Sequence, residues 1–96
     1  MKLGYHPAVQ QDVNRALRRY DNLSTRLGDE FWHELTACIE AAAAGPLRFH
    51  PYVRGLRRAN LKRFPYHFPY LILSDRIRVI VVRHHKQSPT FALQRR

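Results

Sequence analysis

The spacing between apolar residues changes partway along the chain, from the three or four positions of a helix to the two positions of a strand. Before Gly45, two stripes recur at helical spacing: Val9, Val13, Ala16, Leu17 and Tyr20, then Leu27, Phe31, Leu35, Cys38, Ile39 and Ala42. After Gly55, apolar and polar residues alternate over three short runs. Helices that bury one stripe and strands that bury alternate residues pack against each other. The sequence therefore predicts an α+β fold.

The first half is expected to be a hairpin of two helices. A short strand from Lys2 to His6 precedes it, and Pro7 suits the first turn of a helix that ends near Asn22. Ser24 is a candidate N-cap for the second helix, which ends at Gly45-Pro46. Because about two residues join the helices, they must run antiparallel.

The second half predicts three consecutive strands, over Leu56–Lys62, Tyr66–Leu73 and Arg76–Arg83. Ser74-Asp75 forms a tight turn between the last two, which indicates an antiparallel meander. Pro69 has no N–H to give to a ladder, so a bulge or an edge is expected there. The order is βααβββ in a single domain, residues 1–96, with the helical hairpin packed on one face of a small, mainly antiparallel sheet.

Residues outside this pattern also have predicted places. Phe64, Tyr66, Phe68 and Tyr70 share one parity and are expected to pack under the helices. The tail from His84 to Arg96 is polar and basic, with Phe91 and Leu93 available to dock it.

Charge is unevenly divided between the two halves. The chain carries +10 in total. Residues 1–46 hold five bases and six acids, a net charge of −1, whereas residues 47–96 hold twelve bases and one acid, a net charge of +11. Such a segment suits an anionic partner, either nucleic acid or a carboxylate-rich protein, although arginine also fills the solvated row of a sheet. The sequence leaves these readings open.

The cysteine, the histidines and the carboxylates bear on cellular location and on possible chemistry. A lone cysteine, Cys38, suits a reducing cytoplasm and is expected in the core, and no apolar run approaches the ~20 residues that span a bilayer. His67, His84 and His85 lie near the basic residues but lack the spacing of a zinc site, so we expect no metal and no cofactor. The basic half holds no pair of carboxylates, which gives glycosidase or metal-nuclease chemistry no support.

An ordered set of residues resembles the RelE/ParE toxin superfamily of bacterial type II toxin–antitoxin modules. The set comprises Leu27-Gly28, Phe31, a helix end before Pro46, Arg63-Phe64-Pro65-Tyr66, Tyr70, the strand Ile77–Val82, and His84-His85-Lys86 before Pro89. The resemblance covers Leu3 to Arg96. It implies the βααβββ fold, a cognate acidic antitoxin that wraps the toxin in a hetero-oligomer, and a role in plasmid stabilisation or stress response.

The superfamily divides by target. RelE-like relatives cut mRNA on the ribosome with basic residues and a late tyrosine. Aligned on Tyr66, those positions fall at Arg58, Asn60, His67, His85, Lys86 and Phe91. If the chain is such a ribonuclease, Arg58 and Lys86 stabilise charge while His67 or His85 moves the proton.

ParE-like relatives bind and poison DNA gyrase, and the long hairpin and the Phe-Pro-Tyr run resemble this branch better. The altered positions at Asn60, His67 and Phe91 agree with that preference. In this leading hypothesis, basic residues meet the target or the antitoxin, and an apolar groove beside the hairpin holds the antitoxin. The predicted contact residues are Arg57, Arg58, Lys62, Arg63, Arg83 and Lys86. A degenerate member that binds its antitoxin without poisoning anything is the third reading.

Overall fold

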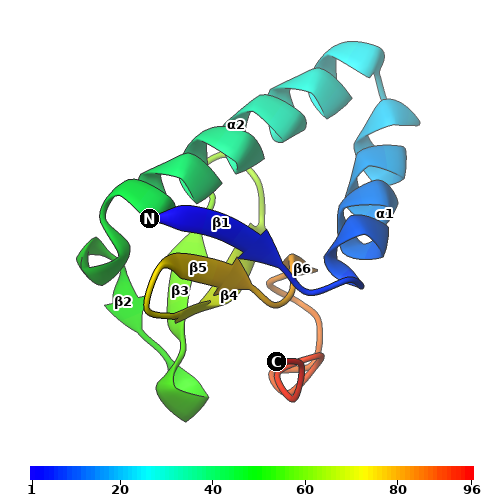
Figure 1. Ribbon diagram of the computed structural model, residues 1–96. Helices are drawn as coiled ribbons and strands as arrows, with labels where there is room; N and C mark the ends of the chain where they lie inside the picture. The colour runs from blue at the N-terminus through cyan, green and yellow to red at the C-terminus, as the bar shows by residue number, and fades with distance from the viewer.

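The computed structural model describes residues 1–96 and confirms the predicted order of helices and strands (Figure 1). The elements are β1 (Lys2–Tyr5), α1 (Val9–Asp21), α2 (Thr25–Ala44), β2 (His50–Pro51), β3 (Arg57–Asn60), β4 (Tyr66–Ile72), β5 (Arg76–Val79) and β6 (Arg83–His84), with 3₁₀ turns at Pro46–Arg48 and Val53–Gly55. The two-residue strands β2 and β6 are additions to the expected set. No helix is both long enough and apolar enough to cross a bilayer.

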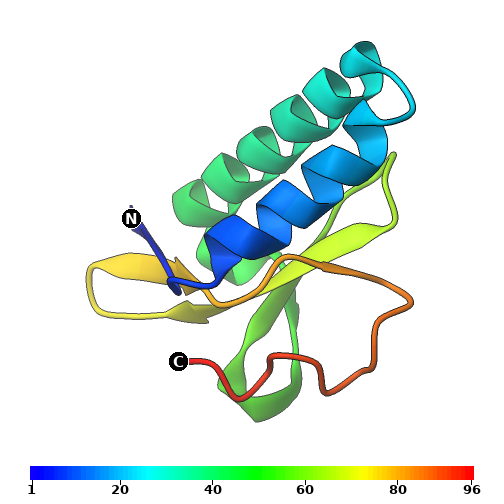
Figure 2. The same ribbon diagram turned by 90° about the vertical axis from the view of Figure 1, so that its right-hand side faces the viewer.

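The two helices lie side by side on one face of the sheet, and the C-terminal segment lies on the other (Figure 2). Ser24 caps α2 as predicted, because its hydroxyl oxygen accepts a hydrogen bond from the Leu27 N–H at 3.0 Å. The helices end within a residue or two of the expected positions. The helix face of the sheet therefore holds the main core.

The strand order is β1-β5-β4-β3-β2, and β6 pairs with β4 beyond the end of β5. β1 runs parallel to β5, and every other pair is antiparallel. The order brings the N-terminal strand to the edge of the sheet beside α2 (Figure 1). The mainly antiparallel sheet and the meander of β3, β4 and β5 match the prediction.

The strand expected over Arg76–Arg83 is broken, and the prediction of one continuous strand is wrong. Val79 pairs with Tyr70, and Arg83 pairs with His67. Three residues, Ile80–Val82, therefore lie opposite only two residues of β4, Phe68 and Pro69. This extra residue is a β-bulge opposite Pro69, whose carbonyl accepts from Ile80 N–H at 3.2 Å. A bulge was expected at Pro69, and it forms in the partner strand. It moves Arg83 to the face away from the helices.

Two apolar cores cover the two faces of the sheet. The larger core has 18 buried residues and includes the four aromatics predicted to lie under the helices, Phe64, Tyr66, Phe68 and Tyr70. The smaller core has five buried residues, Leu56, Ile80, Val81, Ala92 and Leu93, with Phe91 packed against it. The tail therefore docks through Phe91 and Leu93, as the sequence indicated.

Candidate partner-binding surfaces

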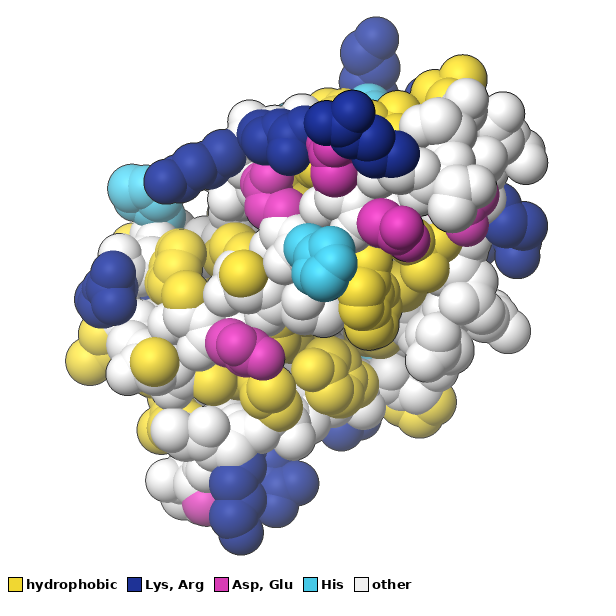
Figure 3. All heavy atoms as spheres, turned by 90° about the horizontal axis from the view of Figure 1, so that it is seen from above, with side chains coloured by type: hydrophobic (Ala, Val, Ile, Leu, Met, Phe, Trp, Pro, Cys, Tyr) yellow, Lys and Arg dark blue, Asp and Glu magenta, His cyan; other side chains and the backbone are white.

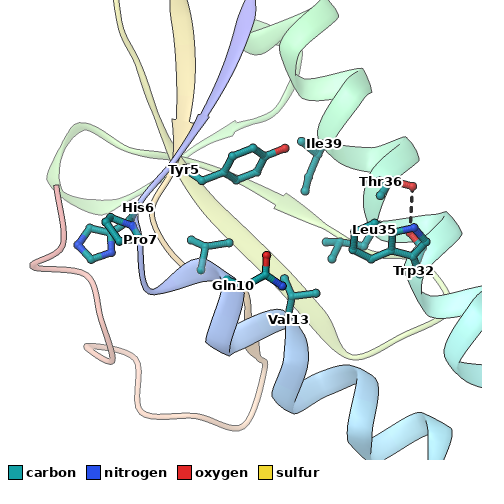
Figure 4. A pocket seen from close by; sticks show the side chains of 10 residues that line it. Tyr5, His6, Pro7, Gln10, Val13, Trp32, Leu35, Thr36 and Ile39 are labelled. Atoms are coloured by element: carbon teal, nitrogen blue, oxygen red, sulfur yellow. Dashed lines mark hydrogen bonds between the residues drawn. The ribbon is translucent and has the colours of Figure 1, made fainter.

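An apolar groove opens between β1, α1 and α2. It has a volume of about 370 Å³ and is lined by Tyr5, His6, Pro7, Val9, Gln10, Val13, Trp32, Leu35, Thr36 and Ile39 (Figure 4). Two large aromatic side chains on its walls remain accessible: Trp32 is 47% exposed and Tyr5 is 45% exposed. The groove can therefore receive apolar side chains from another molecule.

The groove forms where outward-facing residues of β1, α1 and α2 border one another. Phe31 and Leu35 enter the core, which leaves Trp32 on the outer surface of α2. The Thr36 hydroxyl donates to the Trp32 carbonyl at 2.9 Å, so the groove wall has no unpaired hydroxyl proton here (Figure 4). Burial and the nearby Glu40 charge raise the pKa of Tyr5, which stays a neutral phenol. Seen from above, apolar side chains gather across this face with Asp and Glu among them, and Lys and Arg lie nearer its margins (Figure 3).

The predicted basic contact residues differ in how far they are bonded within the chain. Arg57 donates to the carbonyls of Leu47 and Phe49, at 3.3 and 2.8 Å. Arg63 pairs with Glu30 of α2 at 2.5 Å, and the pairing lowers the pKa of Glu30. Lys62 and Lys86 are exposed, and neither forms an ion pair.

Lys62 and Arg63 lie near α2 because their backbone N–H groups both donate to the Glu34 carboxylate. These carboxylates of α2 hold the turn before β4.

Arg83 is buried, with 2% of its surface exposed, and its expected role as a contact residue is corrected by this position. Its Nη1 donates to three carbonyls of the tail, those of Ser88, Pro89 and Phe91. Its other nitrogens are also engaged within the chain. Because all of these donors are used internally, Arg83 holds the tail instead of a partner.

The other two nitrogens of Arg83 bind side chains from different strands and loops. Nη2 donates to the Tyr52 hydroxyl at 2.6 Å, and Nε donates to Nε2 of His67 at 2.8 Å. Burial and the repulsion from Arg58 lower the pKa of Arg83, while Tyr52 opposes that shift. Sequence patterns did not indicate this contact, because Tyr52 lies outside the predicted strands.

Two histidines pair edge to edge beside Arg83. The ring centroids of His67 and His85 are 4.9 Å apart, the ring planes differ by 17°, and the Nδ1 atoms are 2.8 Å apart, so the rings lie edge to edge in nearly one plane. Burial lowers the pKa of His67 to about 3, and the charges of Arg58 and Arg83 add to the shift. Burial and Arg58 also lower the pKa of His85. Both rings are therefore neutral near pH 7.

The structure thus brings Arg58, His67 and His85 to one face of the sheet, with Lys86 next in the chain. Arg58 stacks on Tyr52, 5.3 Å from the ring centroid, and its Nε donates to Oδ1 of Asn60 at 2.8 Å. The alternation of strand residues could have indicated this face, because Arg58 and Asn60 share a parity. The position of Arg83 depends on the bulge, so strand alternation alone could not predict it.

Cys38 is half-buried beside the main core, and burial, with the Glu34 charge, raises its pKa to about 11. It is an unreactive thiol near neutral pH. The prediction that Cys38 belongs with the core side chains agrees with this packing.

Fold and surfaces together define a small basic α+β protein with an open apolar groove, and comparison with known proteins gives its family. The family model described as ParE toxin of the type II toxin–antitoxin system, parDE, matches residues 3–89. The chain belongs to the ParE toxin family, which confirms the superfamily and the branch favoured from the sequence.

One solved structure supports the fold independently. The chromosomal ParDE TA system from P. aeruginosa matches with a TM-score of 0.77 and 17% sequence identity, over 88% of this chain and 95% of that chain. No curated protein matches the chain in sequence.

Proposed function

We propose that this toxin binds and inhibits DNA gyrase, and that a cognate antitoxin holds it inactive by filling the groove between β1, α1 and α2. Membership of the ParE family supports the module, and the similar P. aeruginosa structure is described as a chromosomal ParDE toxin–antitoxin system. The activity requires no chemistry from the toxin itself, only binding.

The observation that carries this proposal is the accessible aromatic lining of the groove. Tyr5 and Trp32 expose nearly half of their surface on a chain of only 96 residues, and the apolar floor of Val13, Leu35 and Ile39 lies between them. Tyr and Trp side chains are enriched among the residues that dominate binding energy at interfaces. An amphipathic antitoxin segment would fill the groove with its apolar side, while its acidic residues meet the surrounding cations.

Among the predicted contact residues, availability differs. Lys62 and Lys86 are exposed without an ion pair, and Arg58 keeps both terminal NH₂ groups free of partners. Arg57 and Arg63 would first have to give up bonds within the chain. We therefore assign target contacts first to Arg58 and Lys86, and antitoxin contacts first to Lys62, which lies beside α2. Arg57 and Arg63 come second in both roles.

A supercoiling assay tests the target. Purified toxin added to DNA gyrase and relaxed plasmid should inhibit supercoiling or trap cleaved DNA, and the antitoxin should restore activity. The antitoxin is sought as a small acidic protein encoded in the adjacent reading frame. Unchanged supercoiling at toxin concentrations well above those of gyrase would remove gyrase as the target, and harmless expression without antitoxin would support the degenerate reading.

A binding assay tests the groove. Trp32 is the single tryptophan, so its fluorescence should shift when the antitoxin covers it. Calorimetry should show that Trp32→Ala weakens antitoxin binding by roughly 30-fold or more, as expected for a central aromatic contact. Leu23→Ala is the matched control, because Leu23 is 72% exposed in the turn between the helices. Equal affinities for both variants would place the antitoxin elsewhere.

The ribonuclease reading has one supporting observation, the gathering of Arg58, His67 and His85 on one face. Both ring nitrogens of His67 are already bonded, to Arg83 and His85, so His67 has no free nitrogen for a substrate. Primer extension on translated mRNA in expressing cells tests this second candidate. We expect no cuts that depend on the toxin.

A further inference from the structure

The sheet face opposite the helices presents a group of side chains whose free polar atoms are all hydrogen-bond donors. Arg58 and Asn60 stand on the same side of β3, since they pair with Pro69 and His67 of β4. His85 contacts His67 edge to edge on this side, with the two Nδ1 atoms 2.8 Å apart. The orientation of each free nitrogen follows from a bond that the same side chain makes inside the protein.

Asn60 is oriented by Arg58. An arginine only donates, so the Asn60 atom that faces Arg58 Nε at 2.8 Å is its oxygen. The amide NH₂ of Asn60 therefore remains free to donate outward. The two terminal NH₂ groups of Arg58 are also unbonded, while its stacking on Tyr52 limits how far the guanidinium can turn.

His85 is oriented through a chain of two bonds that begins at Arg83. Arg83 Nε donates to Nε2 of His67, so this nitrogen must be unprotonated. Neutral His67 then carries its proton on Nδ1 and donates it to Nδ1 of His85, 2.8 Å away. His85 in turn carries its own proton on Nε2. The outer nitrogen of His85 is thus a donor, not a base.

No carboxylate balances these donors. The ion pairs of the protein involve Arg26, Arg63, Arg76 and Arg95, and Arg58 has no acidic partner. Lys86 follows His85 on the exposed surface and adds another cation. A group of donors without an acceptor favours an anion and repels a metal ion.

We propose that Arg58, Asn60 and His85 form a binding site for a phosphate group on the sheet face opposite the helices. Tyr52, His67 and Arg83 position these three side chains. The site offers four donor nitrogens: the two Nη atoms of Arg58, Nδ2 of Asn60 and Nε2 of His85. Four donors exceed what the two oxygens of a carboxylate readily accept, and they suit the three free oxygens of a terminal phosphate. Arg58 is also assigned to target contacts above, but phosphate and octanucleotide binding are measured without gyrase, so either proposal can fail alone.

Two direct probes distinguish a free phosphate from a nucleic-acid strand. Inorganic phosphate and a fluorescein-labelled single-stranded octanucleotide are titrated into the full chain at low salt, followed by histidine ¹⁵N chemical shifts and by anisotropy. Both ligands should change the ¹⁵N chemical shift of His85 Nε2. Tighter binding of the octanucleotide would indicate a strand, and equal binding per phosphate would indicate a free phosphate.

Matched variants test the site. Arg58→Gln should weaken octanucleotide binding tenfold or more, because it removes a charged donor. Arg18→Gln removes the same charge from an exposed position on α1 and should change binding less than threefold. Urea unfolding of each variant confirms that it is folded. Equal weakening by both variants would overturn the site in favour of diffuse attraction.

Two further outcomes would overturn the proposal. In the free protein at pH 7, ¹⁵N spectra should place the His85 proton on Nε2, and finding it on Nδ1 would contradict the chain of bonds. An octaglutamate peptide should bind no better to the parent protein than to Arg58→Gln. If Arg58→Gln weakens the peptide but not the octanucleotide, the site takes an acidic protein instead.

Discussion

The two faces of the sheet are covered in different ways, although the same strands supply both. The helix face has an 18-residue apolar core with tilted and edge-on aromatic pairs. The opposite face has a five-residue core and a buried arginine that binds the tail, a tyrosine and a histidine. On the first face, stability depends on how much apolar area is buried and how closely it is packed. On the second, stability depends on each donor finding its acceptor.

The largest effect is expected on the helix face. Phe31 is fully buried and contacts the rings of Tyr20, Phe64 and Tyr66. Phe31→Ala should lower the free energy of unfolding by about 4 kcal/mol, because it leaves a cavity among rigid rings. Urea unfolding measures this change. Trp32→Ala, at the neighbouring exposed position, should cost less than about 1 kcal/mol, and a similar loss in both variants would contradict the described core.

Arg83→Met should lower the free energy of unfolding by about 3 kcal/mol, because it leaves His67, Tyr52 and the tail carbonyls without their donor. The loss should be local as well as global. Hydrogen exchange should accelerate over residues 88–95 before it does in α1 or α2. Arg76→Met is the control, since Arg76 is exposed and bonds only Asp75. If the tail remains as protected as in the parent protein, the apolar contacts alone hold it.

Acid should weaken the opposite face first. Burial and neighbouring positive charge hold the pKa of His67 at about 3, below the ~6.5 of an unfolded histidine. The unfolded chain therefore binds protons more readily, so this stabilisation is complete above about pH 6.5 and is lost as the pH falls toward 3. The slope should reach up to ~1.4 kcal/mol per pH unit.

Urea unfolding between pH 7 and pH 4 measures this slope. His67→Gln should flatten it, whereas His33→Gln, at an exposed position of α2, should leave it unchanged. Carboxylates contribute equally in the two variants. Parallel profiles for both variants would show that His67 is accessible to protons in the folded protein.

The smallest effect concerns a site that belongs to neither face. Ser24 caps α2 at the exposed end of the hairpin, where only one hydrogen bond depends on it. Ser24→Ala should cost about 1 kcal/mol. Thermal unfolding gives this value, and Ser24→Asp should retain most of the stability. A cost above that of Arg83→Met would reverse the expected ranking.

Sequence patterns predicted the helix face well because that face follows simple periodicity. The two helical stripes, the Ser24 cap and the shared parity of Phe64 to Tyr70 all rest on local spacing. The opposite face was predicted less well because it depends on one extra residue. The run Val79 to Val82 is buried throughout, and such a run in an antiparallel strand signals that both faces are covered. Read in that way, it would have indicated the second core.

The predicted site residues divide along the same line. Arg58, His67 and His85 were selected for charge and chemistry, and strand parity brings them together. Arg83 was selected for the same reasons, yet its guanidinium is internal because the bulge reverses its direction. Neither Tyr52 nor Asn60 could be assigned a partner from spacing, because their contacts cross between separate strands and loops.

The extra residue between Val79 and Arg83 also matters for how relatives of this chain should be compared. Deleting one residue from Ile80–Val82 would restore simple pairing along β4 and turn the following arginine toward the helices. An arginine aligned with Arg83 across a one-residue gap would thus occupy a different environment despite its identity. The number of residues between Val79 and Arg83 is therefore a better guide to whether a relative keeps the tail contact than the presence of an arginine at the aligned position.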